Sequence, residues 1–226
     1  RAICLNVKNG TKVWDIRSVS SFIKLQNFLS SAISKKGEVV FVTSSGDLIK
    51  SNLNDGKIFW SVNTLESTMA HAADFFKSSE IVIDGNIIIF SAKSSIFSFN
   101  LNSGYMNWKR DVSSVGTPII DGKNIFIQTE NGYFVILDKD TGNILSSKNI
   151  LKILKKSKQE TFITGFVMGS EKIYSTTSNG YLIIASPITG KVENFVKIGD
   201  PIVASPVINN GKLYILTQKS RVVVFN

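Results

Sequence analysis

The sequence predicts an all-β fold, a β-propeller of four-stranded antiparallel blades, and three observations lead to this prediction. A six-residue phrase, in which a turn glycine is followed four residues later by tryptophan, occurs at residues 9–14, 55–60 and 103–108. Weaker copies at residues 141–146 and 189–194 keep the glycine, and the five glycines are 46, 48, 38 and 48 residues apart. This period is typical of propeller blades or of two-helix repeats. Short apolar runs separated by turn residues lie between the glycines, which favours strands over helices.

The glycine and the tryptophan of the phrase have different structural roles. A glycine that follows Asn, Asp, Ser or Thr accepts the positive φ that closes a hairpin. The tryptophan lies in the next strand, where a large ring covers the layer between adjacent sheets. Because the ring recurs once per repeat, we expect it to pack between blades rather than to bind a ligand. The residues assigned to this structural repeat are Gly10, Trp14, Gly56, Trp60, Gly104, Trp108, Gly142 and Gly190.

In chain order, the predicted blades follow one another through a single domain, residues 1–226. Hairpin turns such as Asp84-Gly85 and Asn131-Gly132 separate the strands within the blades. The predicted full blades span residues 31–62, 79–110, 116–146 and 161–197. Partial blades lie on either side of them: residues 1–16 give two strands, and residues 202–226 give three, the first of which is predicted from Val203 to Ile208.

Both ends of the chain lie within the repeat pattern. Residues 1–6 occupy the strand that precedes the turn in every other repeat, so we expect a segment upstream of Arg1. The last three strands stop before a turn-and-tryptophan phrase, which leaves their blade without an outermost strand. Since a propeller protects its strand edges by closing, the sequence predicts a truncated ring, or one that is rearranged or self-associated. No charged and then apolar leader precedes the first strand in this sequence.

Three long connectors, at residues 17–30, 63–78 and 147–160, join the outermost strand of one blade to the innermost strand of the next. They are expected to open on one face, beside turns such as Ser45-Gly46. Long loops with apolar residues suggest a binding surface there, and simple capping of the propeller is an equally weighted alternative. Apolar residues at 150, 151, 153 and 154 fit two turns of amphipathic helix. A short interblade helix is favoured over a membrane-surface or partner helix, because the segment is short.

The chain carries 26 basic and 17 acidic residues, a net charge of +9. An anionic partner would suit this excess, but the lysines are spread along the chain, so diffuse solvated charge is favoured. The absence of an interleaved aromatic stripe argues against nucleic-acid binding. The single cysteine, Cys4, excludes internal disulfides and cysteine-based zinc clusters. The single histidine, His71, leaves little scope for histidine-based catalysis or metal binding.

The turn-glycine-tryptophan phrases at blade spacing resemble the PQQ-type β-propeller repeat. Further segments resemble one family that uses this repeat, that of the outer membrane protein assembly factor BamB. They are the run from Asp84-Gly85 to Trp108-Lys109-Arg110 and the tail, which contains Ser178-Asn179-Gly180-Tyr181-Leu182, Thr189-Gly190-Lys191, Ala204-Ser205-Pro206-Val207 and Asn210-Gly211-Lys212-Leu213-Tyr214. The resemblance covers nearly the whole chain and implies a member that lacks its N-terminal part.

This resemblance implies a non-catalytic scaffold subunit of the outer-membrane β-barrel assembly (BAM) machinery. The family forms eight-bladed rings in the bacterial periplasm, usually lipid-anchored to the outer membrane of Gram-negative bacteria, and binds the periplasmic POTRA region of BamA. The anchor cysteine would lie in the missing segment, because Cys4 is inside a repeat. The family's BamA-binding surface uses two interblade connectors. The matching residues here are Ile23, Lys24, Leu25 and Gln26, in which Gln26 replaces the family's arginine, and Asp74.

Two other classes of function stay open at this point. A quinone-dependent dehydrogenase would need a calcium site and commonly an adjacent Cys-Cys pair, and one cysteine excludes the pair. A sensor or generic protein-interaction propeller needs neither, and a membrane span with a signalling domain upstream would distinguish it from the BamB role. We therefore expect no enzymatic activity, no cofactor and no metal.

Overall fold

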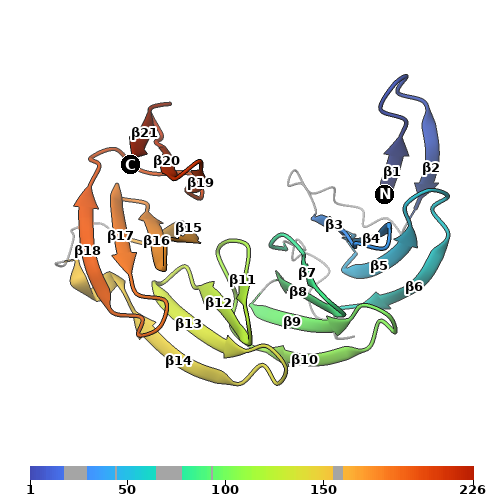
Figure 1. Cartoon of the computed structure of the whole chain (residues 1–226), viewed down its shortest axis with the longest axis horizontal. Helices are drawn as coiled ribbons and strands as arrows, with labels where there is room; N and C mark the ends of the chain where they lie inside the picture. Colours follow the sequence, from blue (N-terminus) through green and yellow to red (C-terminus); the bar gives the residue numbers. More distant parts are fainter. Residues whose placement is uncertain (18–29, 44, 65–77, 93, 155–159) are drawn as a thin grey trace. The chain divides into compact units, whose positions relative to one another are not determined.

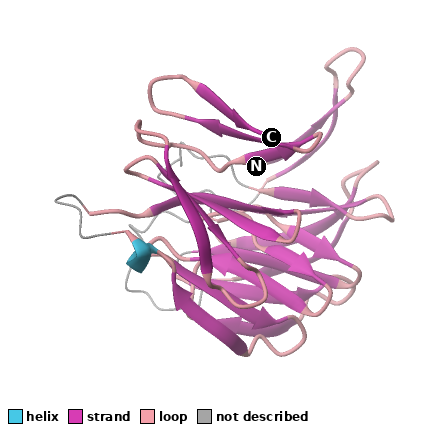
Figure 2. Ribbon diagram, turned by 60° about the vertical axis from the view of Figure 1, so that its left-hand side comes forward, coloured by secondary structure: helices cyan, strands magenta, loops and turns pink. Residues whose placement is uncertain are grey.

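The computed structural model describes residues 1–17, 30–43, 45–64, 78–92, 94–154 and 160–226. They separate into two compact units, Arg1–Asp111 and Val112–Asn226, which we call the N-terminal and C-terminal units and describe one at a time. Strands make up nearly all the regular structure of both units, and the helical exception among the described residues is one 3₁₀ turn, η1 (Leu151–Ile153) (Figure 2). The predicted all-β class and its four-stranded antiparallel sheets are confirmed.

The N-terminal unit holds a two-stranded sheet and then two four-stranded antiparallel sheets, with strands adjacent in sequence order (Figure 1). The two-stranded sheet pairs β1 (Ala2–Leu5) with β2 (Lys12–Ile16). The next sheet contains β3 (Ser31–Ile33), β4 (Glu38–Val42), β5 (Asp47–Asn52) and β6 (Ile58–Asn63). The last contains β7 (Val82–Asp84), β8 (Ile87–Ala92), β9 (Ser95–Asn100) and β10 (Met106–Arg110).

The C-terminal unit holds two four-stranded sheets and a final sheet of three strands. The first comprises β11 (Ile119–Asp121), β12 (Asn124–Gln128), β13 (Tyr133–Asp138) and β14 (Ile144–Asn149). The second comprises β15 (Ile163–Gly169), β16 (Lys172–Thr177), β17 (Tyr181–Ala185) and β18 (Val192–Lys197). The third comprises β19 (Val207–Asn209), β20 (Lys212–Leu216) and β21 (Val222–Phe225).

The first strand of the final sheet is shorter than the sequence suggests. It was expected from Val203, but β19 begins at Val207, and a single bridge between Ile202 and Thr217 lies ahead of it. Pro206 stands directly before β19 and has no N–H to donate to a ladder, so regular pairing starts after it.

A β-bulge recurs where the third strand of a sheet meets its outermost partner. Lys50 and Ser51 of β5 face Trp60 and Ile58 of β6, which leaves Phe59 as the extra residue. The same irregularity interrupts the β1–β2, β9–β10, β13–β14 and β17–β18 pairs. A bulge bends its strand and changes the direction of the side chains beside it. Because the bulge recurs at the same place in these sheets, the residue after it points in the same direction each time.

In the N-terminal unit that residue is a tryptophan, which packs on the turn glycine of the next sheet. The Trp14 indole donates from Nε1 to the Leu53 carbonyl at 2.8 Å, and a Cβ placed on Gly56 would lie 2.7 Å from Trp14 Cγ. Trp60 repeats both contacts one sheet later, against Leu101 and Gly104. The predicted packing of these rings between blades is confirmed for Trp14 and Trp60.

The C-terminal unit fills the equivalent position without tryptophan. A Cβ on Gly190 would lie 3.3 Å from Lys148 Cδ and 3.3 Å from Phe134 Cδ1. The Lys148 ammonium also donates to the Thr189 carbonyl, so an aliphatic stem with a charged end replaces the indole and its N–H. Buried side chains of the two four-stranded sheets of this unit form a common core. It contains Phe134, Ile150, Ile163 and Ile173.

The layer that contains Trp60 also holds a buried ion pair. Lys50, whose side chain is 5 % exposed, lies on the same face of β5 as Leu48 and places Nζ 2.8 Å from Glu38 Oε1. It also lies 5.3 Å from the centre of the Phe59 ring. Burial on its own raises the pKa of Glu38, but hydrogen bonds from Lys50 and from the Ser34 hydroxyl outweigh it and hold this pKa below its ordinary 4.5.

Candidate partner-binding surface

The connectors begin against the turn between the second and third strands of the sheet they leave. The N–H of Thr64, directly after β6, donates to the Gly46 carbonyl at 2.9 Å. Ile150, after β14, makes the same bond to Gly132 at 2.9 Å, and Ile198, after β18, bonds to Gly180 at 2.8 Å. Three connecting segments therefore start at the same end of their sheets, beside the turns at Gly46, Gly132 and Gly180.

Asparagine side chains strengthen two of these starts. The last residue of β6, Asn63, donates from Nδ2 to the Ser45 carbonyl at 3.3 Å, and Asn149 at the end of β14 makes the matching bond to the Asn131 carbonyl at 3.2 Å. The end of the first connector is held by the next sheet. The N–H of Ile81, directly before β7, donates to the Ser30 hydroxyl at 2.6 Å.

The turns themselves are built on a threonine that the sequence analysis did not single out. The Thr177 hydroxyl accepts the N–H of Tyr181 at 2.9 Å while the Thr177 carbonyl accepts the N–H of Gly180 at 3.1 Å. Thr43, Thr129 and Thr217 make the same pair of bonds in their own turns. The sequence does carry a signal for these turns, which is a threonine three residues before the turn glycine. After Thr217, Ser220 takes the place of the glycine.

Three exposed apolar side chains lie at this end of the C-terminal unit. Tyr133 starts β13, Ile153 lies in η1 and Phe162 precedes β15, and they are 39 %, 45 % and 42 % exposed. We call these three residues the connector-side patch. η1 fits closely over the turn beneath it, since a Cβ on Gly132 would lie 2.4 Å from Leu151 Cγ.

The helix predicted in this connector is a single 3₁₀ turn. Leu154 donates its N–H to the Leu151 carbonyl, three residues back, at 3.0 Å and is itself extended, with ψ 125°. Ile150 is already tied to Gly132, and both Leu151 and Leu154 pack against the core. The segment is anchored at both ends within five residues, which leaves no length for a second α-helical turn.

Charged clusters lie close to two connectors. Asp15 meets Arg1, Lys12 and Arg17 just before the first connector, and the Arg1 hydrogen bond lowers the pKa of the Asp15 carboxyl to about 2. In the C-terminal unit, Asp200 pairs with Lys219 at 3.1 Å and with Arg221 at 2.8 Å. Both carboxylates are surrounded by basic groups, so neither presents a bare negative charge.

The predicted partner-binding residues Ile23, Lys24, Leu25 and Gln26 lie outside the described residues, as does Asp74. The lone histidine, His71, lies outside them as well. What the structure does show is where the second and third connectors begin: the N–H groups of Thr64 and Ile150 bond to the turns at Gly46 and Gly132. Cys4 stands opposite Trp14 in the β1–β2 ladder, as an ordinary strand residue.

The described residues contain neither a metal-binding cluster nor a membrane-spanning helix. In that part of the chain, no cluster of three or more His, Cys, Asp or Glu side chains has the arrangement of a metal site. None of the described helices has the length and apolar character needed to cross a membrane.

Comparison with known proteins agrees on one family. The sequence profile described as outer membrane protein assembly factor BamB matches residues 1–148. The BamB of Yersinia pestis is 22 % identical over 98 % of this chain and 55 % of its own length. The BamB of Moranella endobia is 18 % identical over 96 % of this chain and 55 % of its own length. The chain thus spans about half the length of these curated relatives.

Solved structures give the same fold. The crystal structure of BamB from Moraxella catarrhalis superposes with a TM-score of 0.79 at 13 % identity, covering 97 % of this chain and 65 % of that one. The β-propeller domain of Cps50 (Swd1) from Myceliophteria thermophila superposes with a TM-score of 0.65 at 10 % identity, covering 90 % and 67 %. At such identities the likeness establishes the β-propeller fold, as the sequence predicts.

Proposed function

The chain belongs to the family of the outer membrane protein assembly factor BamB, and from this we propose that it is a non-catalytic scaffold in outer membrane protein assembly. The observation that carries the proposal is the ordered frame of the connectors. Backbone and asparagine hydrogen bonds tie the starts of the second and third connectors to the turns at Gly46 and Gly132, and a backbone bond ties the segment after β18 to Gly180. Long loops held on rigid sheets in this way are suited to binding another protein.

We propose that the partner is the periplasmic POTRA region of BamA. The contacts assigned to it are the first connector, through Ile23, Lys24, Leu25 and Gln26, and the second connector, through Asp74. The connector-side patch of the C-terminal unit supports the choice of surface, because exposed aromatic and aliphatic side chains are typical anchors of protein interfaces. On this proposal the protein works at the periplasmic face of the outer membrane of a Gram-negative bacterium.

Binding of purified BamA POTRA domains, measured by calorimetry or pull-down, tests the assignment. We expect Leu25→Asp and Asp74→Lys each to weaken binding at least about tenfold if they are interface anchors. Tyr105→Asp is the matched control, because Tyr105 is 78 % exposed but follows the turn at the other end of its sheet. Failure of the folded wild-type chain to bind the POTRA domains would refute the partner assignment.

The non-catalytic part of the proposal rests on side-chain chemistry. One cysteine and one histidine in 226 residues give no adjacent cysteine pair and little nucleophilic or general-base capacity. Addition of pyrroloquinoline quinone and Ca²⁺ should therefore leave the absorption spectrum of the quinone unchanged. A saturable difference spectrum would contradict the scaffold role and favour a quinone-dependent enzyme.

A further inference from the structure

The sequence contains four Asn-Gly dipeptides, and the fold holds them with very different firmness. They are Asn9-Gly10, Asn131-Gly132, Asn179-Gly180 and Asn210-Gly211. Asparagine is a chemically labile residue, and glycine after it offers no side chain to hinder attack of its own backbone nitrogen on the asparagine side chain. Because the four sites share this dipeptide, a difference in their reactivity comes from the surrounding structure.

Three of the four glycines have their N–H held by a hydrogen bond within the turn. Each donates to a carbonyl three or four residues back: Gly10 to Asn6 at 2.8 Å, Gly132 to Thr129 at 3.0 Å and Gly180 to Thr177 at 3.1 Å. Such a bond fixes the plane of the peptide that joins the asparagine to the glycine. The glycine nitrogen therefore cannot turn toward the asparagine side chain without breaking it.

The asparagine side chains at these three sites are held as well. Thr11 donates its N–H and its hydroxyl to Asn9 Oδ1, at 3.1 Å and 2.8 Å. In the other two turns the threonine hydroxyl three positions before the glycine is the donor, from Thr129 to Asn131 Oδ1 and from Thr177 to Asn179 Oδ1. Ring closure at these sites thus requires the loss of at least two hydrogen bonds.

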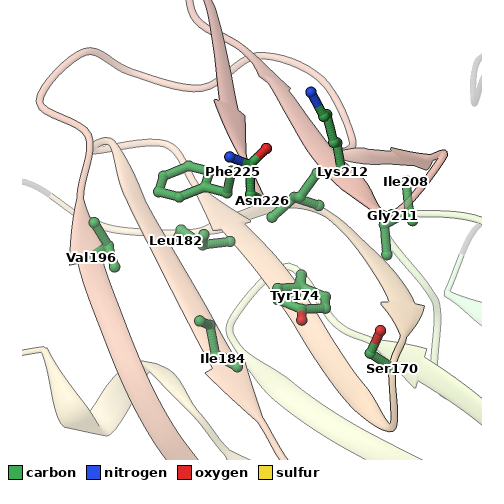
Figure 3. A pocket seen from close by; sticks show the side chains of 11 residues that line it. Ser170, Tyr174, Leu182, Ile184, Val196, Ile208, Gly211, Lys212, Phe225 and Asn226 are labelled. Carbon is green, nitrogen blue, oxygen red and sulfur yellow. The ribbon is translucent and has the colours of Figure 1, made fainter.

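The fourth dipeptide, Asn210-Gly211, forms the two-residue turn between β19 and β20, with Asn209 opposite Lys212. Figure 3 shows Gly211 close to Ile208 of β19 and to Lys212 of β20. Among the described residues, neither the side chain of Asn210 nor the N–H of Gly211 has a hydrogen-bond partner. Both residues are exposed, and no atom lies within 4 Å of a Cβ placed on Gly211.

The backbone of this turn also favours the reaction. Asn210 has φ +49° and Gly211 has φ +73°, the signs of a type I′ turn, whereas none of the other three asparagines has a positive φ. A type II′ turn keeps the positive φ of the first residue and differs in the orientation of the central peptide. Rotation of that peptide, which glycine accepts, brings the Gly211 nitrogen toward the Asn210 side chain.

We propose that Asn210 is a site of spontaneous covalent modification by water, which converts it to aspartate and isoaspartate. The Gly211 nitrogen gives its proton to hydroxide and bonds to the side-chain carbonyl carbon of Asn210. The bond from this carbon to the amide nitrogen breaks, ammonia leaves, and a five-membered succinimide ring remains. Water then opens the ring at either carbonyl, so that one water is consumed and one ammonia released, with no change of oxidation state.

The two products alter the turn in different ways. Opening at the side-chain carbonyl restores the normal backbone and leaves a carboxylate next to Lys212 in the turn. Opening at the backbone carbonyl leaves the chain running through the former side chain, which adds one carbon between Asn209 and Lys212. A longer turn does not fit the pairing of these two residues, so isoaspartate loosens the β19–β20 hairpin.

Peptide mapping by mass spectrometry, during incubation of the full chain at mildly alkaline pH, tests the proposal. In the folded protein Asn210 should be converted at least about tenfold faster than Asn9, Asn131 or Asn179, because only those three must first lose hydrogen bonds. In concentrated urea the turns are lost, and the four rates should converge. Equal rates in the folded protein, or faster conversion at another of the four sites, would overturn the proposal. A ranking that persists in urea would overturn it too, because the turn would then not be the cause.

Two variants keep the test decisive. Asn210→Ser retains an exposed polar turn without an amide, and should abolish the early phase of ammonia release from the folded chain. Thr11→Val removes one hydrogen bond from Asn9 Oδ1, and should speed conversion of Asn9 about two- to tenfold. Early ammonia release that survives Asn210→Ser would place the reaction elsewhere, and an unchanged rate at Asn9 would show that hydrogen bonds do not set the order. Either result would refute the assignment of Asn210.

Discussion

Replacing Gly104 by alanine tests the packing between sheets at its tightest contact with Trp60. Gly104 has φ +75°, and a Cβ there would lie 2.8 Å from Trp60 Cδ2 and 3.0 Å from Cε3. The indole cannot retreat freely, because its Nε1 is bonded to the Leu101 carbonyl at 3.0 Å. The substitution therefore combines backbone strain with overlap against a held ring.

The expected cost follows from these two terms. A left-handed backbone costs a non-glycine residue about 1–2 kcal/mol. Forcing an extra carbon into a packed layer costs about 1–3 kcal/mol more, so Gly104→Ala should lower the free energy of unfolding by about 2–5 kcal/mol in total. Gly85→Ala is the matched control, since Gly85 has φ +56° in the same sheet and no atom within 4 Å of a Cβ. It should cost only the backbone term.

Urea unfolding followed by circular dichroism gives both free energies, and a graded series sharpens the comparison. Gly56→Ala, with its Cβ 2.7 Å from the Trp14 ring, should match Gly104→Ala, whereas Gly190→Ala, with 3.3 Å to Lys148 and Phe134, should lie between these and Gly85→Ala. If Gly104→Ala and Gly85→Ala cost the same within about 0.5 kcal/mol, the ring contact contributes nothing measurable and the reasoning fails.

Three further predictions concern polar groups. Glu38→Leu strands the buried Lys50 ammonium and should cost about 3 kcal/mol, much of it recovered by adding Lys50→Met; full additivity in this double-mutant cycle would argue against the ion pair. Because bonding lowers the folded pKa of Asp15 to about 2, its stabilisation is complete above pH 3.8 and disappears as the pH falls toward 2. Arg1→Ala should move this pKa toward 3.8 in an NMR titration, and an unchanged pKa would show that Arg1 is not the cause. Thr177→Val should cost about 1 kcal/mol and speed exchange of the N–H that starts β17, and unchanged exchange would contradict the role of the hydroxyl.

The sheets were predictable because their turns require particular residues. Glycine at positive φ is needed where the third strand turns into the fourth, as at Gly56 and Gly104, and its spacing revealed the repeat. Alternation of short apolar runs with turns then gave the strand order within each sheet. The two-unit division was not predicted, because the sequence pattern continues through Asp111 and Val112 without a break in composition.

Several contacts of the C-terminal unit were less predictable, because they join residues that share no sequence pattern. Lys148 takes the place of a tryptophan although it lies two positions beyond the repeat's tryptophan site, and only the fold brings it to Gly190. The connector-side patch likewise depends on how η1 lies over Gly132. Sequence periodicity predicted a longer helix where η1 is a single 3₁₀ turn. A sequence pattern reveals contacts that recur from repeat to repeat, whereas each of these contacts occurs once among the described residues.

The substitutions within the repeat also change what fills the interface between neighbouring sheets. Each interface needs a bulky group from the outermost strand of one sheet and a turn with a glycine from the next. Trp60 with Gly104 supplies both, and Lys148 with Gly190 supplies both with a longer, charged side chain. In β18 the tryptophan position is held by Asn194, which is exposed and supplies no such group.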